Sequence, residues 1–339
     1  MTGTLEGTIL VGDEFEAVEG RLHVENGQIA EIEEIETDSS DIILPAFVNA
    51  HTHIGDSTAK EAGGGLSLDE LVTPPDGLKH RLLRAASREE KVEAMRRSVR
   101  FMESTGTAAF LDFREGGVEG VEAIRDALAG RNIDPVIFGR ETAAAMHAAD
   151  GFGASGARDS EFGDLREAAR EANKPFAIHT GERDPHDITP AMDLDPAFLV
   201  HMVHPREQHL ARLDEEETPV VVCPRSNLVT NVGVPPIREL ADRTNVALGT
   251  DNVMLNSPSM FREMEFAAKL ADVSAEEVLR MATTHGAKLA DKEYGVVEEG
   301  RPAKLLVLDG DSDNLCDAKD LVRAVVRRAG EADVTDVLL

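Results

Sequence analysis

Short apolar segments alternate with helical segments over most of this 339-residue chain. Eight such apolar segments lie between residues 42 and 252. The stretches between them, such as SREEKVEAMRRSVRFMEST at 87–105, carry apolar residues at helical spacing. A strand followed by a helix, repeated, predicts parallel βα units. Eight units over about 245 residues match the size of a TIM barrel, so we expect an α/β chain built on a (β/α)8 barrel.

The predicted barrel strands cover residues 42–53, 108–115, 134–141, 151–159, 174–182, 197–204, 218–227 and 246–252. Both ends of the chain have a different pattern. Residues 5–44 alternate short apolar runs with turns such as Asn26-Gly27, and the tail after residue 290 returns to strand and turn chemistry. We expect 1–44 and 291–339 to form one small β-sandwich domain beside a barrel domain of 45–290.

The charge balance excludes two classes of partner. Lys plus Arg number 35 and Asp plus Glu 64, so the formal net charge is −29. Nucleic-acid phosphates and anionic membranes need clustered basic surface, and this chain repels both. Only nine of the basic residues are Lys, and such acid-rich, Lys-poor composition suits a highly saline cytoplasm, where salt screens self-repulsion. An acidic surface without salt adaptation is the alternative.

Cysteine usage and apolar runs bear on the compartment. Cys223 and Cys316 are too few for a disulfide framework or a thiolate metal cage. The first twenty residues lack a basic region followed by an apolar one, and no run of about 18 apolar residues occurs. We therefore expect a cytoplasmic protein that is neither exported by a visible signal nor embedded in a membrane.

Histidines collect where the predicted strands end, which is where TIM-barrel enzymes place their chemistry. His51 and His53 end the first strand, His179 the fifth and His201 the sixth, while Asp251 ends the eighth. Side chains two residues apart on a strand share a face, so His-x-His forms a ready chelate. Another imidazole and a carboxylate from other strands would complete a set suited to one divalent metal, Zn²⁺ or Fe²⁺.

The segments LPAFVNAHTH, IHTGE, LVHMVHP, CPRSNL and ALGTDN, in this order, resemble the amidohydrolase superfamily over almost the whole chain. The string HTGE is similar to the His-x-x-Glu signature of its adenosine, cytosine and thiomethyladenosine or homocysteine deaminase branch, and chlorohydrolases are related. Carried over by position, the resemblance implies one metal ion bound by His51, His53, His179 and Asp251.

The resemblance also implies catalytic roles. Glu182 matches the acid that gives a proton to the ring nitrogen of an aminated heterocycle. His201 matches the imidazole beside a metal-bound hydroxide, and Asp251 would carry the proton of the attacking water to the departing amine. His204 falls on the following loop as a structural or pocket-lining residue. Binuclear relatives carry a bridging Lys or Glu on strand three or four; here only Glu141 could serve, so a single metal is favoured.

Arginines also stand at or just beyond the strand ends. These are Arg114, Arg140, Arg183 and Arg225. They could bind a carboxylate or phosphate of an anionic substrate, or they could pair with nearby acids such as Glu115. Asn227 is a further candidate for the pocket wall. Residues 54–75, with three consecutive glycines, predict a mobile flap over the pocket, although a disordered loop would have the same composition.

The function expected from these features is deamination of an aminated purine-, pterin- or pyrimidine-like ring by attack of metal-bound hydroxide. Hydrolysis of a cyclic amide or of a ring carbon–halogen bond is the alternative that the same metal set supports. A non-catalytic metal-binding protein is the third, and Glu182 and His201 argue against it, because neither is needed to hold a metal. The partner would be a small molecule, and the resemblance suggests a homo-oligomer.

Overall fold

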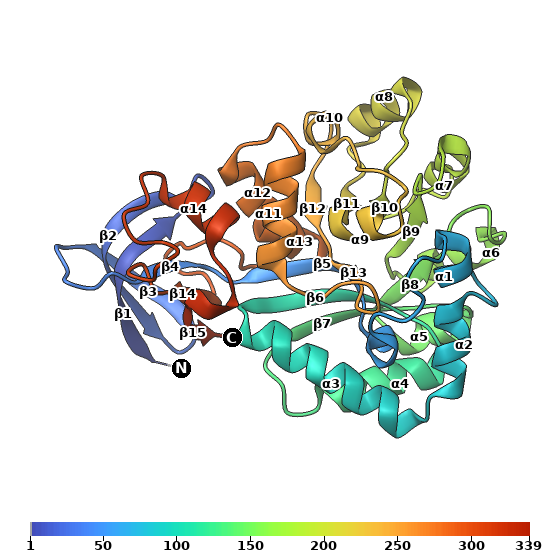
Figure 1. Ribbon diagram of the computed structural model, residues 1–339, viewed down its shortest axis with the longest axis horizontal. Coiled ribbons are helices and arrows are strands. Elements are labelled where there is room, and N and C mark those ends of the chain that lie inside the picture. Colours follow the sequence, from blue (N-terminus) through green and yellow to red (C-terminus); the bar gives the residue numbers. More distant parts are fainter. Residues whose placement is uncertain (1) are drawn as a thin grey trace.

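A computed structural model describes residues 2–339, and the strands in that range form two sheets (Figure 1). One is a six-stranded sheet with the order β15-β14-β4-β1-β2-β3, and the other is a parallel sheet with the order β12-β11-β10-β9-β8-β7-β6-β5-β13. In Figure 1 the first sheet lies at one end of the molecule together with both chain termini. The second is surrounded by helices.

The six-stranded sheet joins the two ends of the chain, as expected. Its strands are β1 (Gly3–Val11), β2 (Glu16–Glu25), β3 (Gln28–Glu34), β4 (Ile42–Pro45), β14 (Leu305–Leu308) and β15 (Val334–Leu338). Asn26 and Gly27 have φ of 52° and 79° between β2 and β3, the backbone that a two-residue hairpin turn requires. These strands form one sheet, so the sandwich arrangement and the domain boundaries stay predictions.

The barrel strands are β5 (Phe47–His53), β6 (Thr107–Arg114), β7 (Asp134–Gly139), β8 (Gly151–Ala154), β9 (Phe176–Thr180), β10 (Phe198–His201), β11 (Val220–Val222), β12 (Val246–Leu248) and β13 (Asp251–Asn252). Strand β12 pairs with β11, whereas β13 pairs with β5. Residues 249 and 250 alone separate β12 from β13, so this one segment pairs with both β11 and β5 and closes the barrel. This closed parallel sheet fits the predicted TIM-like barrel.

The closing seam depends on a glycine. A Cβ at Gly249 would lie 2.7 Å from the Cβ of His51, so no larger residue fits there without displacing β5. The next residue fastens the seam: Thr250 N–H donates to Asn49 Oδ1 at 3.0 Å, and Asn49 Nδ2 donates to Thr250 Oγ1 at 2.7 Å. The barrel therefore closes beside the histidines of β5.

Several predicted strands differ from the structure: 246–252 divides into β12 and β13, 151–159 ends at Ala154, and the largest differences are in 42–53 and 218–227. The segment 42–53 divides at Ala46, so its first part is β4 of the terminal sheet and its second part is β5. The prediction of strand over 218–227 is wrong beyond residue 222, because Pro224 begins the helix α9 (Pro224–Val229). Proline suits the first helical position, since its missing N–H has no partner there in any case.

Helices cover the outside of the barrel (Figure 1). They are α1 (Leu68–Val72), α2 (Leu78–Ala85), α3 (Arg88–Ser104), α4 (Gly117–Leu128), α5 (Ala143–Ala148), α6 (Gly163–Glu171), α7 (Ile188–Met192), α8 (Glu207–Glu216), α9, α10 (Ile237–Ala241), α11 (Met260–Leu270), α12 (Ala275–Ala282), α13 (Thr284–Leu289) and α14 (Leu321–Arg328), with short 3₁₀ turns at η1 (Ile54–Ala59), η2 (Pro185–Asp187) and η3 (Glu331–Asp333). Among residues 2–339, no helix combines the length and apolar character needed to cross a bilayer.

Candidate active site

Three histidines and one aspartate from three strands meet at the carboxyl end of the barrel. The Nε2 atom of His179 lies 3.2 Å from His51 Nε2 and 3.3 Å from His53 Nε2. Asp251 Oδ1 lies 3.4 Å from His51 Nε2 and 3.6 Å from His53 Nε2. Four donors that surround one Zn²⁺ tetrahedrally at about 2.1 Å are about 3.4 Å apart, which these four distances match. The donor atoms that all lie within 4.8 Å of one another are those of His51, His53 and His179, so the three histidines form the group that could hold one metal ion, and Asp251 lies beside two of them.

The hydrogen bonds on the far side of two rings support this reading. His179 Nδ1 lies 2.7 Å from the carbonyl oxygen of Ala154, and His53 Nδ1 lies 3.0 Å from that of Phe113. A carbonyl can only accept, so each Nδ1 carries the hydrogen and each Nε2 of a neutral ring presents a lone pair. Two lone pairs 3.3 Å apart share no proton, and a cation between them resolves the conflict.

Burial keeps these groups in the forms that bind a metal. It lowers the pKa of His51 and of His179, and it lowers the pKa of His53 to about 3, so all three rings are neutral near pH 7. Burial alone would raise the pKa of Asp251. The hydrogen bond with His51 and the neighbouring imidazoles outweigh it, and the pKa lies well below its ordinary value. The donor set is therefore three neutral imidazoles and one carboxylate.

The second group of predicted residues lies against the first. The ring of His201 stacks on that of His179 with centroids 5.4 Å apart, and His201 Nε2 lies 3.7 Å from Glu182 Oε2. The side-chain nitrogen of Asn227 lies 3.2 Å from His201 Nδ1 and 3.5 Å from Glu182 Oε1. Since an amide nitrogen donates, Nδ1 of His201 accepts, and its Nε2–H points to the carboxylate side.

Two strand-end residues have unusual backbone conformations. His201 has φ of 80° and Asp251 has φ of 57°, both in the left-handed region. Such residues cost about 1–3 kcal/mol each and cluster at functional sites. The carboxylate of Asp251 is held on both sides, because Ser226 Oγ donates to Oδ2 at 2.5 Å and Asn252 Nδ2 donates to Oδ1 at 2.9 Å. The fold thus holds His201 and Asp251 in strained backbone conformations that direct their side chains toward the pocket.

A pocket of 90 Å³ opens onto this group. Its wall includes His53, His179, Glu182, His201 and Asp251. The segment predicted as a flap contributes α1 and the residues that follow it. Glu70 and Ser67 form a capping box at the start of α1, so this part of the segment is ordered as a helix over the pocket.

Each of the four strand-end arginines pairs with an acid of the protein. Arg114 donates to Glu115 at 2.6 Å, and Arg140 donates to the same carboxylate at 3.1 Å. Arg225 Nε donates to the buried Glu263 at 2.5 Å. Arg183 pairs with an aspartate of α1. The alternative of internal pairing therefore holds for all four, and the substrate-binding role of Arg114, Arg140, Arg225 and Asn227 stays a prediction.

A buried charge cluster that the sequence did not predict lies beside the candidate metal donors. Glu115 Oε1 lies 2.9 Å from His53 Nδ1 and 2.7 Å from Lys79 Nζ. Lys79, on α2, also donates to Asn252 Oδ1 at 2.8 Å. Burial would raise the pKa of Glu115, but Lys79, His53 and Arg114 hold it well below its ordinary value. The position of Glu115 at the end of the predicted strand 108–115 could have indicated a place in the site. Nothing in the sequence around Lys79, which lies on a polar helix, indicated that it is buried.

Two residues that the sequence left open lie away from the donor cluster. Glu141, the candidate bridge to a second metal, accepts a hydrogen bond from the backbone N–H of Gly116 at 3.0 Å. Within residues 2–339, the group that could hold a metal contains His51, His53 and His179 but not Glu141. His204 lies on the loop after β10, where its backbone N–H donates to Gly181.

Comparisons with known proteins bear on the family and the fold. Residues 42–338 match the model of the Amidohydrolase family. A protein of Methanothermobacter thermautotrophicus, provisionally named an aminohydrolase, is 36% identical over 89% of this chain and 90% of its own length. A 5-methylthioadenosine/S-adenosylhomocysteine deaminase of Haloarcula marismortui is 28% identical over 88% and 80%. The crystal structure of an adenosine deaminase from Xanthomonas campestris with bound zinc superposes with a TM-score of 0.84 at 18% identity, covering 99% of this chain and 91% of that one.

Proposed function

The chain belongs to the amidohydrolase family, and on this premise we propose that it is a metal-dependent hydrolase that deaminates an aminated purine-, pterin- or pyrimidine-like ring. The proposed metal ligands are the four donors of the strand ends, His51, His53, His179 and Asp251. The proposed catalytic residues are those that line the same pocket, Glu182, His201 and Asp251.

One observation carries this proposal: an acid whose side chain is 19% exposed and a buried imidazole line the same pocket as the metal donors without belonging to them. Glu182 and His201 line the pocket with Asp251, and holding a metal requires neither of them. Burial raises the pKa of Glu182. A carboxyl group with a raised pKa keeps its proton closer to neutral pH, which is the property that a general acid needs. Glu182 can therefore donate to a ring nitrogen.

The remaining residues handle the attacking water. A divalent metal held by the four donors would lower the pKa of a coordinated water toward neutrality. Asp251, ionised and held by Ser226 and Asn252, accepts the proton of that water and delivers it to the departing amine. The Nε2–H of His201 points into the site and stabilises negative charge that develops on the attacking oxygen. Ammonia then leaves, and the remaining proton of the added oxygen restores Glu182 to its acid form as the ring carbonyl forms.

Zn²⁺ is the metal that we propose, with Fe²⁺ as the alternative, because both accept a mixed set of imidazole and carboxylate donors. A single ion is proposed, since Glu141 is occupied with the backbone of Gly116. Cytoplasmic location, homo-oligomer formation and adaptation to high salt stay predictions from the sequence.

Hydrolysis of a cyclic amide or of a ring carbon–halogen bond remains the second candidate. The same donors and the same acid would serve it, and only the leaving group differs. Glu182 favours a substrate with a protonatable ring nitrogen, but such nitrogens also occur beside ring halogens. The assay must therefore identify the product that leaves.

The test combines metal analysis with product analysis. The protein is purified in high salt, its metal content is measured, and ammonia release is followed over a panel of aminated heterocycles, with lactams and halogenated rings in parallel. Glu182→Gln and Asp251→Asn are compared with Glu171→Gln, an exposed glutamate on α6 that serves as the control.

We expect about one equivalent of metal, ammonia release from at least one ring, and a loss of about 10²-fold or more in Glu182→Gln, as for other general acids. Metal far below one equivalent, or full activity in both variants, would refute the mechanism. Halide release or lactam opening without ammonia would select the second candidate.

A further inference from the structure

A second and larger cavity adjoins the active-site pocket. It measures 560 Å³, whereas the pocket at the metal donors measures 90 Å³. Side chains of His80, Arg140 and Ser155 line both, so the two spaces share a wall. Pockets that bury most of a small ligand usually measure about 300–1,000 Å³. The first pocket alone falls below that range, and the second lies within it.

One side of the second cavity is apolar. Its wall comes from the strand β8, the loop after it and the helices α2, α3, α4 and α6, which contribute Phe152, Phe162, Leu83, Met95, Ala123 and Leu165. Phe152 and Phe162 stand 6.2 Å apart between ring centroids. Such a wall favours an apolar or aromatic group, because burial of apolar surface contributes about 25 cal/mol per Å².

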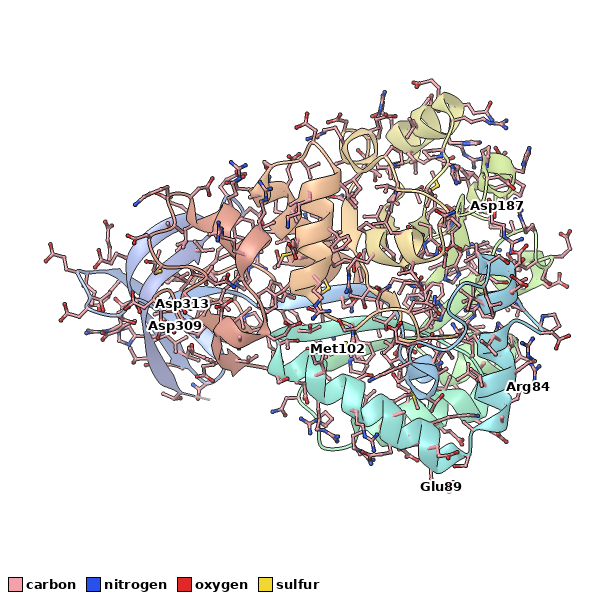
Figure 2. The ribbon with its side chains drawn as sticks, in the orientation of Figure 1. Arg84, Glu89, Met102, Asp187, Asp309 and Asp313 are labelled. Carbon is pink, nitrogen blue, oxygen red and sulfur yellow. The ribbon has the colours of Figure 1, made fainter. Side chains whose placement is uncertain are left out.

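The other side carries cations. Arg84 of α2 and Arg88 and Lys91 of α3 line the cavity. Arg84 and Arg88 are half-exposed and pair with Asp76 and Asp126. Figure 2 shows Arg84 at the outer edge of α2, at the end of the molecule away from Asp309 and Asp313, which follow β14. These three side chains thus place positive charge at the solvent end of the cavity.

Lys91 is the most informative of them. It is half-buried, and in the described range 2–339 no carboxylate lies within ion-pair distance of its ammonium group. The other four cations of the lining each have an acid partner: Arg114 and Arg140 pair with Glu115, Arg84 with Asp76 and Arg88 with Asp126. Lys91 is therefore the lining cation that is complementary to an anionic group of a ligand.

We propose that the two cavities form one substrate site. The aminated ring occupies the first, and an apolar or aromatic substituent that ends in an anionic group, such as a carboxylate or phosphate, occupies the second with its anion at Lys91. The inference rests on the proposed deaminase function for the ring and adds the class of substrate: a heterocycle with an extended, anionic substituent rather than a free base.

A binding test does not depend on catalysis. The probe is 8-anilino-1-naphthalenesulfonate, an aromatic sulfonate, titrated by fluorescence into the folded protein with and without metal. Lys91→Gln removes the cation and Leu165→Trp fills the apolar end, with Ala123→Leu as a second filling variant. The controls change the same helices outside the cavity: Arg97→Gln on α3 and Glu171→Trp on α6. Unfolding curves show that each variant is folded.

We expect Lys91→Gln to raise the Kd of the probe about tenfold, the value of one charge-assisted hydrogen bond. Leu165→Trp or Ala123→Leu should raise it by a similar factor, while both controls retain the wild-type Kd. An unchanged Kd in Lys91→Gln and in a folded filling variant would overturn the proposal, because the probe then binds elsewhere.

A kinetic test separates this inference from the proposed function. Deamination of a free aminated base is compared with deamination of the same base carrying an aryl or alkyl substituent that ends in a carboxylate. We expect a higher kcat/KM for the substituted ring and a larger loss for that ring in Lys91→Gln. Equal kcat/KM for both rings would overturn the substrate class alone. Absence of ammonia from both would count against the proposed function, and the probe titration would still decide the cavity.

Discussion

Replacement of Glu115 by glutamine should destabilise the barrel more than any single change at its surface. Its carboxylate contacts the cations Lys79, Arg114 and Arg140 at 2.7, 2.6 and 3.1 Å, and its side chain is 5% exposed. Removing one member of a buried ion pair costs about 3–5 kcal/mol, because the partner charge remains buried without compensation. A typical domain has about 5–15 kcal/mol of stability in total.

The Glu115→Gln change is measured by denaturant unfolding of the metal-free protein, with Glu93→Gln as the control. Glu93 also contacts several arginines but is 43% exposed, and its loss should cost under about 1 kcal/mol. A second variant, Glu115→Gln with Arg140→Gln, removes an anion and a cation together and should recover part of the loss. Purely additive costs, or a cost of Glu115→Gln as small as that of Glu93→Gln, would refute this account of the cluster.

Glu115→Gln also predicts an effect on metal binding. The carboxylate accepts from His53 Nδ1 at 2.9 Å, and loss of such a partner typically weakens metal affinity about 10–100-fold. Competition with a chelator measures this affinity. Unchanged affinity would mean that the carbonyl oxygen of Phe113 orients His53 without Glu115.

Three further predictions concern pH, the seam and salt. Burial raises the pKa of Asp56 to about 7 from its ordinary value near 4, so folding favours the protonated carboxyl group. The stability that this group contributes is therefore lost as pH rises from about 4 through about 7. Asp56→Asn should abolish that part of the pH dependence of the unfolding free energy, and the same pH dependence in both proteins would contradict it. Gly249→Ala should displace His51, since the new Cβ would lie 2.7 Å from that of His51, and should weaken metal affinity about tenfold or more. Competition with a chelator measures this affinity. Wild-type affinity would show that β5 can shift without disturbing the metal donors. Raising KCl from about 0.1 M to about 1 M shortens the screening length from about 10 to about 3 Å. Because the net charge is −29, this screening weakens self-repulsion and should raise Tm. A flat or falling Tm would count against salt adaptation.

Local pattern in the sequence was enough for the barrel and for the core of the candidate site. Strand and helix periods identify βα units, and parallel strands align their carboxyl ends, so the sequence alone predicts that His51, His53, His179 and Asp251 lie at one end of the barrel. The structure places His179 Nε2 3.2–3.3 Å from Nε2 of His51 and His53, and Asp251 Oδ1 3.4–3.6 Å from the same two nitrogens. The turn at Asn26-Gly27 was equally readable, because it depends on two adjacent residues.

Tertiary structure decided the features that depend on pairing between distant segments. Whether Arg225 faces a ligand or an internal acid depends on Glu263, which is 38 residues away. Lys79 looks like a surface lysine on a polar helix until α2 packs beside Glu115. The second cavity needs four helices and a loop to exist at all. The sequence by itself determined which side chains stand at the strand ends, while the folded chain determined which charges they meet, because Coulombic and packing partners are set by contacts that no local pattern encodes.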